Sequence, residues 1–231
     1  MSDLRPDLSI LESVDTTRED WVASPSAQVL RKRVHRVGPA ESGQVTSVVR
    51  YLPGAAFPAH DHPEGEEILV LDGVFSDEHG DWPAGTYLLN PEGFRHAPFS
   101  KEGCDIFVKL RQFPGTDREH IAIQTRDLPW AATETPGLER KALYAQSSFR
   151  DTTTLERWTP ELSSVRSYPE GAELFVIEGQ WEDASDVHGP GTWLRLPTGA
   201  EHTPRVSAPC VVYVKRGGFA YLNPSEAPAA T

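Results

Sequence analysis

The chain has 231 residues, 38% of them hydrophobic and 24% charged, which suits a globular protein of one large or two small domains. Its net charge of −12 argues against nucleic acid and anionic membranes as partners, because no basic excess offsets phosphate charge. No run approaches the length of a membrane-spanning helix, and the N-terminus lacks the apolar core of a signal peptide. Cys104 and Cys210 make no disulfide framework, so we expect a cytoplasmic protein with no membrane partner.

Short apolar runs recur along the first half of the chain. They are rich in β-branched and aromatic residues, have the length of strands, and are bounded by Gly, Pro and Asp. The runs are VTSVVRYL (45–52), EEILVLDGVF (66–75), GTYLLN (85–90) and CDIFVKLRQF (104–113). Prolines and glycines are spread between such runs rather than clustered, which is typical of turns. The sequence therefore predicts an all-β protein.

The second half of the chain repeats the first. At an offset of 106 positions, EEILVLDGVFSD (66–77) aligns with AELFVIEGQWED (172–183), and Cys104 aligns with Cys210. GTYLLNPEGFRHAP (85–98) likewise aligns with GTWLRLPTGAEHTP (191–204). We predict two all-β units, each a small antiparallel sandwich or barrel, with residues 1–118 forming the first and residues 119–231 the second.

Four potential metal ligands lie in the first half, namely His60, His62, Glu66 and His96. Residues two apart on a strand share a face, so His60 and His62 point the same way. Glu67 is the alternative carboxylate, but alternation places it on the opposite face from Glu66. Three imidazoles and one carboxylate suit one divalent ion per chain, such as Fe, Zn, Mn or Ni. Four protein ligands leave coordination positions open for water, substrate or dioxygen, and a single carboxylate preserves the Lewis acidity of the ion.

Two motifs carry a family resemblance. Gly54, His60, His62, Glu66 and Gly73 stand at the spacing of the first cupin motif, and the stretch from Gly85 through Pro91 and Gly93 to His96 resembles the second, with Ser100 in place of a late asparagine. The wider sequence from residue 50 to 104 resembles the cupin domain of ChrR-like anti-sigma factors. The resemblance covers nearly the whole chain and implies two tandem jelly-roll-like cupin barrels in which His60, His62, Glu66 and His96 hold the metal.

The resemblance to anti-sigma factors has one departure. Those proteins carry an N-terminal helical domain with a zinc site of His and Cys, whereas no His or Cys precedes Trp21 in this sequence. We therefore do not expect anti-sigma activity.

The repeat has lost the metal ligands in the second half. The offset of 106 maps His60, His62 and Glu66 onto Arg166, Tyr168 and Ala172, and only His96 keeps a histidine, His202. We predict a second barrel without metal, in which Arg166 pairs with Glu173 as a structural substitute for the ion. This barrel either supports the first or binds an anionic effector.

Function is open at this level, with an enzyme favoured. The ligand set resembles that of quercetin and acireductone dioxygenases, which implies a metal-dependent dioxygenase or related oxidoreductase acting on a small oxygenated compound such as a β-dicarbonyl or an aromatic ketone. Glu66 is the candidate catalytic residue, because its carboxylate can accept a proton. The alternatives are a regulatory or sensing module with a protein partner and a structural zinc site. Tyr51, Phe57, Phe94 and Phe107 could line a pocket, but each is more often plain core. A homodimer is compatible with the sequence.

Overall fold

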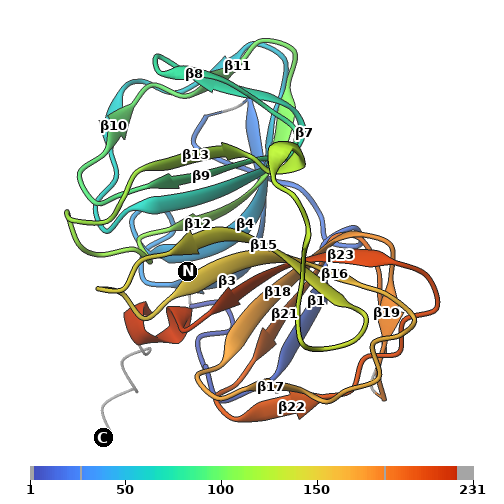
Figure 1. Ribbon diagram of the computed structural model, residues 1–231. Coiled ribbons are helices and arrows are strands. Elements are labelled where there is room, and N and C mark those ends of the chain that lie inside the picture. The colour runs from blue at the N-terminus through green and yellow to red at the C-terminus, as the bar shows by residue number, and fades with distance from the viewer. Residues whose placement is uncertain (1–2, 27, 185, 223–231) are drawn as a thin grey trace, which may run out of the picture. The chain divides into compact units, whose positions relative to one another are not determined.

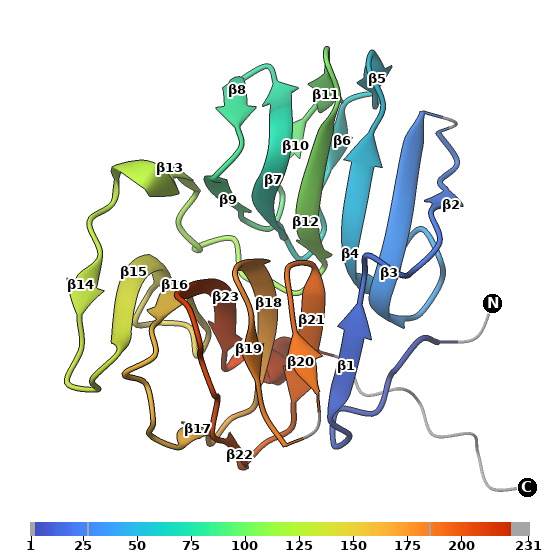
Figure 2. The same ribbon diagram turned by 90° about the vertical axis from the view of Figure 1, so that its right-hand side faces the viewer.

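The computed structural model describes residues 3–26, 28–184 and 186–222. Two compact units divide the chain between them: residues 3–7, 20–124 and 221–222 form the first, and residues 8–19 and 125–220 form the second. Both are built from antiparallel strands (Figures 1 and 2). Within the described ranges, no helix is long and apolar enough to span a membrane.

The first unit is a sandwich of a long sheet and a layer of shorter strands. The long sheet has the order β13-β9-β7-β12-β4-β3-β2; β8 and β11 also pair with β7, β5 pairs with β11, and β10 pairs with β6 (Figure 2). The strands of this unit are β2 (Val22–Ala23), β3 (Val29–Val37), β4 (Gln44–Tyr51), β5 (Ala55–Ala56), β6 (His60–Asp61), β7 (Glu66–Asp77), β8 (Gly80–Pro83), β9 (Thr86–Asn90), β10 (Arg95–His96), β11 (Phe99–Ser100), β12 (Cys104–Leu110) and β13 (Ile121–Gln124).

The second unit repeats this plan. Its main sheet has the order β1-β21-β18-β23-β16-β15-β14, and β17 pairs with β22 as β19 does with β20. Its elements are β1 (Glu12–Asp15), η1 (Thr125–Asp127), β14 (Ala131–Ala132), β15 (Leu138–Ala145), β16 (Thr152–Trp158), β17 (Arg166–Tyr168), β18 (Ala172–Glu178), β19 (Trp181–Glu182), β20 (Val187–His188), β21 (Thr192–Leu196), β22 (Ala200–His202) and β23 (Cys210–Arg216), followed by the short 3-10 helix η2 (Gly218–Tyr221).

Two segments do not follow the predicted boundary between residues 118 and 119. Residues 8–19 belong to the second unit because β1 adds to its sheet edge, where Val14 pairs with Trp193 (Figure 2). Residues 119–124 belong to the first unit because β13 pairs with β9, with Ile121 opposite Leu89. Each crossing segment completes the hydrogen bonding of an edge that would otherwise expose unpaired backbone groups.

Each unit encloses its own apolar core. The first packs around Ile68, Val70, Phe75 and Ile106, and the second around Trp158, Trp181, Leu174 and Val212. Cys104 and Cys210 occupy matching positions in these cores, and burial raises the pKa of their thiols to about 11 and about 12. Both cysteines are therefore small buried hydrophobic groups rather than reactive thiols.

Candidate metal centre

The predicted ligands come from two short strands and the beginning of a long one. His60 and His96 are paired residues of β6 and β10, His62 follows β6, and Glu66 begins β7. Between His62 and Glu66 the chain turns sharply through Gly65, whose φ of 68° lies in the left-handed region that glycine adopts without strain. The turn lets residues on both sides of it face the same space inside the sandwich.

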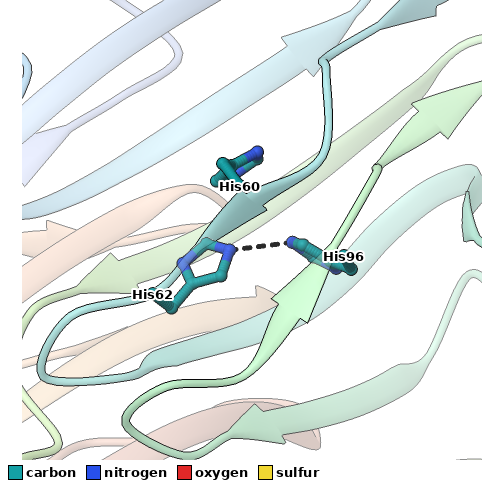
Figure 3. Close-up of side chains that lie close together, drawn as sticks. All are labelled: His60, His62 and His96. Atoms are coloured by element: carbon teal, nitrogen blue, oxygen red, sulfur yellow. Dashed lines mark hydrogen bonds between the residues drawn. The ribbon is translucent and has the colours of Figure 1, made fainter.

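The three imidazoles converge on one point. A ring nitrogen of each of His60, His62 and His96 lies within 4.8 Å of those of the other two (Figure 3). The Nε2 atoms of His62 and His96 are 2.8 Å apart, and both rings are buried. Two ring nitrogens this close require either a shared proton or a cation between them. Among the described residues, this is the one grouping of three His, Cys, Asp or Glu side chains placed to hold a metal ion.

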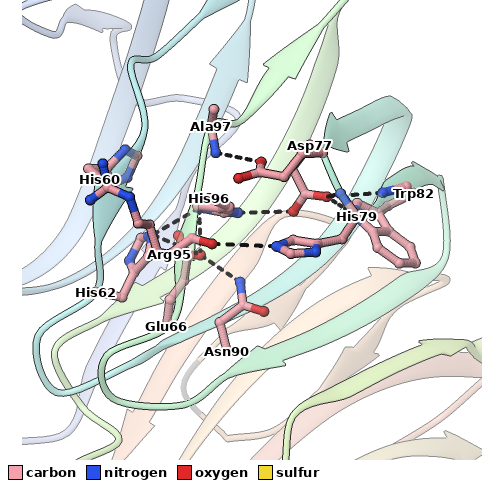
Figure 4. Close-up of polar contacts among 12 residues, drawn as sticks. His60, His62, Glu66, Asp77, His79, Trp82, Asn90, Arg95, His96 and Ala97 are labelled. Carbon is pink, nitrogen blue, oxygen red and sulfur yellow. Dashed lines mark hydrogen bonds and ion pairs between the residues drawn. The ribbon is translucent and has the colours of Figure 1, made fainter.

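The carboxylate of Glu66 approaches the same point. Its Oε2 atom lies 3.6 Å from Nε2 of His62 and 3.6 Å from Nε2 of His96. Asn90, the cross-strand partner of Glu66, donates from Nδ2 to this oxygen at 3.0 Å (Figure 4). The amide therefore holds one carboxylate oxygen beside the imidazoles.

Hydrogen bonds behind two of the rings fix their orientation. His60 donates from Nδ1 to the carbonyl of Pro58 at 2.8 Å. His96 donates from Nδ1 to Oδ2 of Asp77 at 3.0 Å (Figure 4). Asp77 in turn accepts from the indole of Trp82 at 3.3 Å. Protons on both Nδ1 atoms leave the Nε2 lone pairs of His60 and His96 available for a metal.

The electrostatics of the site favour a bound cation. Burial lowers the pKa of His62 below its ordinary value in spite of the nearby Glu66 charge, so this ring is neutral at physiological pH. Burial also acts to lower the pKa of His96, but the bond to Asp77 and the charge of Glu66 outweigh it and raise this pKa. Burial acts to raise the pKa of Asp77, yet its bonds to His96 and the backbone of His79 lower it overall. The carboxylates of Glu66 and Asp77 therefore both lie next to the imidazole of His96.

Sequence analysis did not single out Asp77 and Asn90. Asp77 is the last residue of the twelve-residue strand β7, and its repeat in the second half, Asp183, was a signal that could have marked it. Asn90 has Leu196 as its counterpart, so the repeat gives no such signal. Glu67 bonds to the hydroxyl of Tyr87, in keeping with its predicted position on the face opposite Glu66.

A cavity of about 90 Å³ adjoins the imidazoles. Its walls include valine, isoleucine and leucine side chains of β3, β4 and β12. Of the four aromatic residues that the sequence offered, Tyr51 and Phe57 line it, whereas Phe94 and Phe107 are not among its lining residues. His60, His62 and Glu66 also line it, and Arg31 and Ser47 add further polar groups. A single water needs about 10–15 Å³ of such space, so the cavity has room for a small organic molecule beside the candidate ligands.

The second unit fills the equivalent position with its own side chains. Tyr168, in place of His62, donates from its hydroxyl to Nε2 of His202 at 3.2 Å. Burial lowers the pKa of His202 to about 4, so the ring is neutral and accepts this bond. Tyr168 thus bonds to His202, the histidine at the position equivalent to His96.

The predicted pair of Arg166 and Glu173 is wrong. Arg166 donates from Nη2 to Oε2 of Glu156 at 2.8 Å, while Glu173 accepts from the indole of Trp193 at 3.1 Å. Glu173 directly follows Ala172 on β18, and alternation along a strand turns it to the opposite face.

The fold and the site together define a class. A chain with two antiparallel sandwiches, one of which gathers imidazoles from paired strands around an internal cavity, is a two-domain cupin. The model of the ChrR cupin-like domain family matches residues 11–114 and again residues 118–220, so the chain belongs to that family.

Solved structures agree with this fold at low sequence identity. A candidate dioxygenase from Nostoc punctiforme superposes with a TM-score of 0.74 at 16% identity, covering 95% of this chain and 88% of that one. A cupin 2 conserved barrel domain protein from Leptotrichia buccalis gives 0.60 at 11% identity, covering 92% and 98%. A deletion mutant of Bacillus subtilis oxalate decarboxylase gives 0.60 at 14% identity, covering 93% and 78%. The search of curated proteins found no match.

Proposed function

We propose that the chain is a metal-dependent oxidoreductase of the dioxygenase type that acts on a small oxygenated organic compound. The observation that carries this proposal is the convergence of three imidazoles and one carboxylate beside a cavity that two of those imidazoles and the carboxylate help to line. A purely structural metal site needs no adjoining space, whereas a catalytic site requires room for a substrate beside the ion. The candidate dioxygenase among the similar structures supports the same class of reaction.

In this proposal one divalent ion is held by His60, His62, Glu66 and His96. The donor set fits such an ion, because the Nε2 atoms of His62 and His96 and the Oε2 atom of Glu66 already lie 2.8 and 3.6 Å apart. Nitrogen and oxygen ligands about 2.0–2.2 Å from a shared ion are separated by comparable distances. Imidazole and carboxylate ligands suit Fe, Zn, Mn or Ni. A bound ion would act as a Lewis acid that polarises a substrate oxygen.

The protein's own groups have separate roles in this proposal. Glu66 accepts a proton from the substrate, and the amide of Asn90 keeps its Oε2 atom in place while it does so. Asp77 fixes the orientation of His96. The aliphatic walls around Tyr51 exclude water from the reacting atoms.

The cavity limits the substrate to a compact molecule. Its volume of about 90 Å³ is well below the roughly 300–1,000 Å³ of pockets that bind drug-sized ligands. Six of its fourteen lining residues are valine, isoleucine or leucine, which favours an apolar body with its oxygen atoms directed at the imidazoles. Short-chain β-dicarbonyl compounds combine these properties.

Metal analysis and oxygen uptake test the proposal. Elemental analysis of the purified chain is expected to give one divalent ion, which His96→Ala abolishes and His120→Ala retains, because His120 is exposed and lies outside the imidazole grouping. Oxygen consumption is then measured with short β-diketones after loading with Fe, Mn, Ni or Zn. Uptake that depends on both metal and His96 supports the proposal. A chain that binds metal but consumes no oxygen with any pairing of ion and substrate contradicts the enzymatic function.

A second candidate is a metal-dependent sensing module that binds a protein partner. Membership of the ChrR cupin-like family favours it. Affinity capture with the metal-loaded chain and with the His96→Ala variant compares the two candidates. A partner recovered only by the loaded chain supports sensing, and the absence of any such partner together with oxygen uptake supports the enzyme.

A further inference from the structure

Three arginines in the second unit share one buried carboxylate. Glu156 on β16 has no solvent exposure, and its Oε1 accepts from Nε of Arg140 at 2.9 Å and from Nη2 of Arg216 at 3.0 Å. Its Oε2 accepts from Nη2 of Arg166 at 2.8 Å and from the indole of Trp158 at 2.9 Å. We call the group formed by Glu156 and its three arginine partners, Arg140, Arg166 and Arg216, the arginine cluster.

The arginine cluster has more positive than negative charge. Burial acts to raise the pKa of Glu156, but the charges of Arg216, Arg166 and Arg140 outweigh it, and the pKa is held below its ordinary value. Glu156 is thus ionised at neutral pH, and guanidinium groups remain protonated in proteins. Three positive charges and one negative charge leave a surplus of two, a charge that a small anion can neutralise.

The register of the sheets places the cluster where the first unit has its cavity. Arg140 pairs with Glu156 as Arg31 pairs with Val49, and Arg216 pairs with Ala172 as Leu110 pairs with Glu66. Likewise Arg166 pairs with His202 as His60 pairs with His96. The counterparts Arg31, Val49, Leu110 and His60 all line the cavity beside the imidazoles. The strand positions that line the cavity beside the imidazoles in the first unit therefore bear the arginine cluster in the second unit.

The cluster has unused donors and an open edge. Nε of Arg166 is buried without a hydrogen-bond partner. Arg140 and Arg216, which bond the same oxygen of Glu156, have side chains that are 40% and 26% exposed. A guanidinium has five N–H donors in a planar fork that matches carboxylate and phosphate oxygens. The donors not given to Glu156 are therefore able to bind a second, external anion.

We propose that the second unit binds a small oxyanion with two negative charges, held by Arg140 and Arg216 at the open edge and by Arg166 below them. The shared chemistry of the ligand is a pair of charged oxygen groups, which a small dicarboxylate and an inorganic phosphate both offer. The site is independent of the proposed metal centre, because none of its residues is among the candidate metal ligands.

Calorimetric titration of the full-length chain tests this site. Phosphate and malonate are titrated separately at pH 7.5, with chloride of equal ionic strength as the control titrant. Comparing the two shows whether the site prefers inorganic phosphate or a small dicarboxylate. Saturable binding of either anion supports the proposal, and its absence for both overturns it. His96→Ala must bind the same anion with unchanged affinity. Binding lost in that variant assigns the anion to the imidazoles instead and overturns the proposal.

Matched variants locate the site. Arg216→Gln and Arg140→Gln are expected to raise the Kd about tenfold or more, because each removes a charged donor pair. Arg157→Gln is the control: Arg157 lies next to Glu156 on β16 but pairs with Glu139, outside the cluster. An equal loss in Arg157→Gln shows that binding is a general charge effect and overturns the site. Arg216→Lys keeps the charge without the fork, and an intermediate Kd in this folded variant supports specific recognition even if Arg216→Gln fails to fold.

Discussion

His96 donates from Nδ1 to the carboxylate of Asp77 at 3.0 Å, and this bond links the candidate metal centre to the far end of strand β7. The bond places the proton on Nδ1 and directs Nε2 at His62 and Glu66. In the second unit, the equivalent pair is looser, with Nδ1 of His202 and Asp183 3.9 Å apart. The tight pair is therefore found in the unit that has the candidate metal centre, where an oriented imidazole is needed for ligation.

Asp77→Asn tests this orientation. The variant keeps the shape of the side chain and removes its charge, so we expect metal affinity to fall about tenfold to a hundredfold with the fold retained. The measurement is competition with a chelator of known affinity. Asp61→Asn serves as the control, because Asp61 is exposed and contacts Arg95 rather than a ligand. Equal affinity in Asp77→Asn and wild type would contradict the role of this bond.

Leu110→Phe tests the cavity as the substrate site. Leu110 lines the cavity and is only partly buried, so the larger ring enters the open space with limited strain. Overpacking of this kind costs about 1–3 kcal/mol of folding free energy, less than most domains possess. We expect bound metal to be retained and turnover of a β-diketone to be lost.

Leu110→Met is the matched control, because it conserves volume and is expected to keep most of the turnover. Full activity in Leu110→Phe would place the substrate outside this cavity.

Glu156→Gln tests the carboxylate at the centre of the arginine cluster. The change leaves three guanidiniums around a neutral amide, and the removal of one partner from a buried ionic group costs about 3–5 kcal/mol. Glu139→Gln disrupts the partly exposed pair with Arg157 and is expected to cost less than about 1 kcal/mol. Urea unfolding followed by tryptophan fluorescence compares the two variants. Similar losses in both would show that the cluster contributes no more than a surface pair.

The low pKa of His202 gives the second unit a defined pH dependence. Because the folded pKa of about 4 lies below the ordinary 6.5, the unfolded chain binds the extra proton between these values. Stability therefore falls as the pH is lowered from about 6.5 to about 4, by up to about 3 kcal/mol from this group. The charged and titratable groups around the ring are Asp183, Arg166, His188, Glu156 and Tyr168.

His202→Gln isolates this contribution. The other groups titrate in both proteins, so the difference in unfolding free energy between wild type and variant is followed from about pH 7 to about pH 4.5, across the range in which the two states bind different numbers of protons. We expect the variant to lose less stability than wild type over this range. Parallel curves would mean that His202 titrates normally in the folded chain.

The sequence analysis and the structure agree best where a rule is local. Period-two alternation correctly placed Glu67 apart from Glu66, and the offset of 106 correctly matched β7 with β18 and β12 with β23. The same alternation rules out the predicted pair of Arg166 and Glu173, since Glu173 is the repeat of Glu67. The true partner of Arg166 is Glu156 on β16, and the spacing of residues along the sequence does not indicate that these two side chains meet.

By itself, the sequence determined the all-β class, the twofold repeat and the closeness of His60 to His62, because strand alternation and turn residues act over a few positions. Tertiary structure alone decided which distant groups meet. Asp77 and Asn90 reach the imidazoles, and three arginines reach Glu156, through pairings between separate strands. The units also exchange segments at the sheet edges, since β1 joins the second unit. Such contacts depend on sheet order and register, which long-range packing fixes and local spacing does not record.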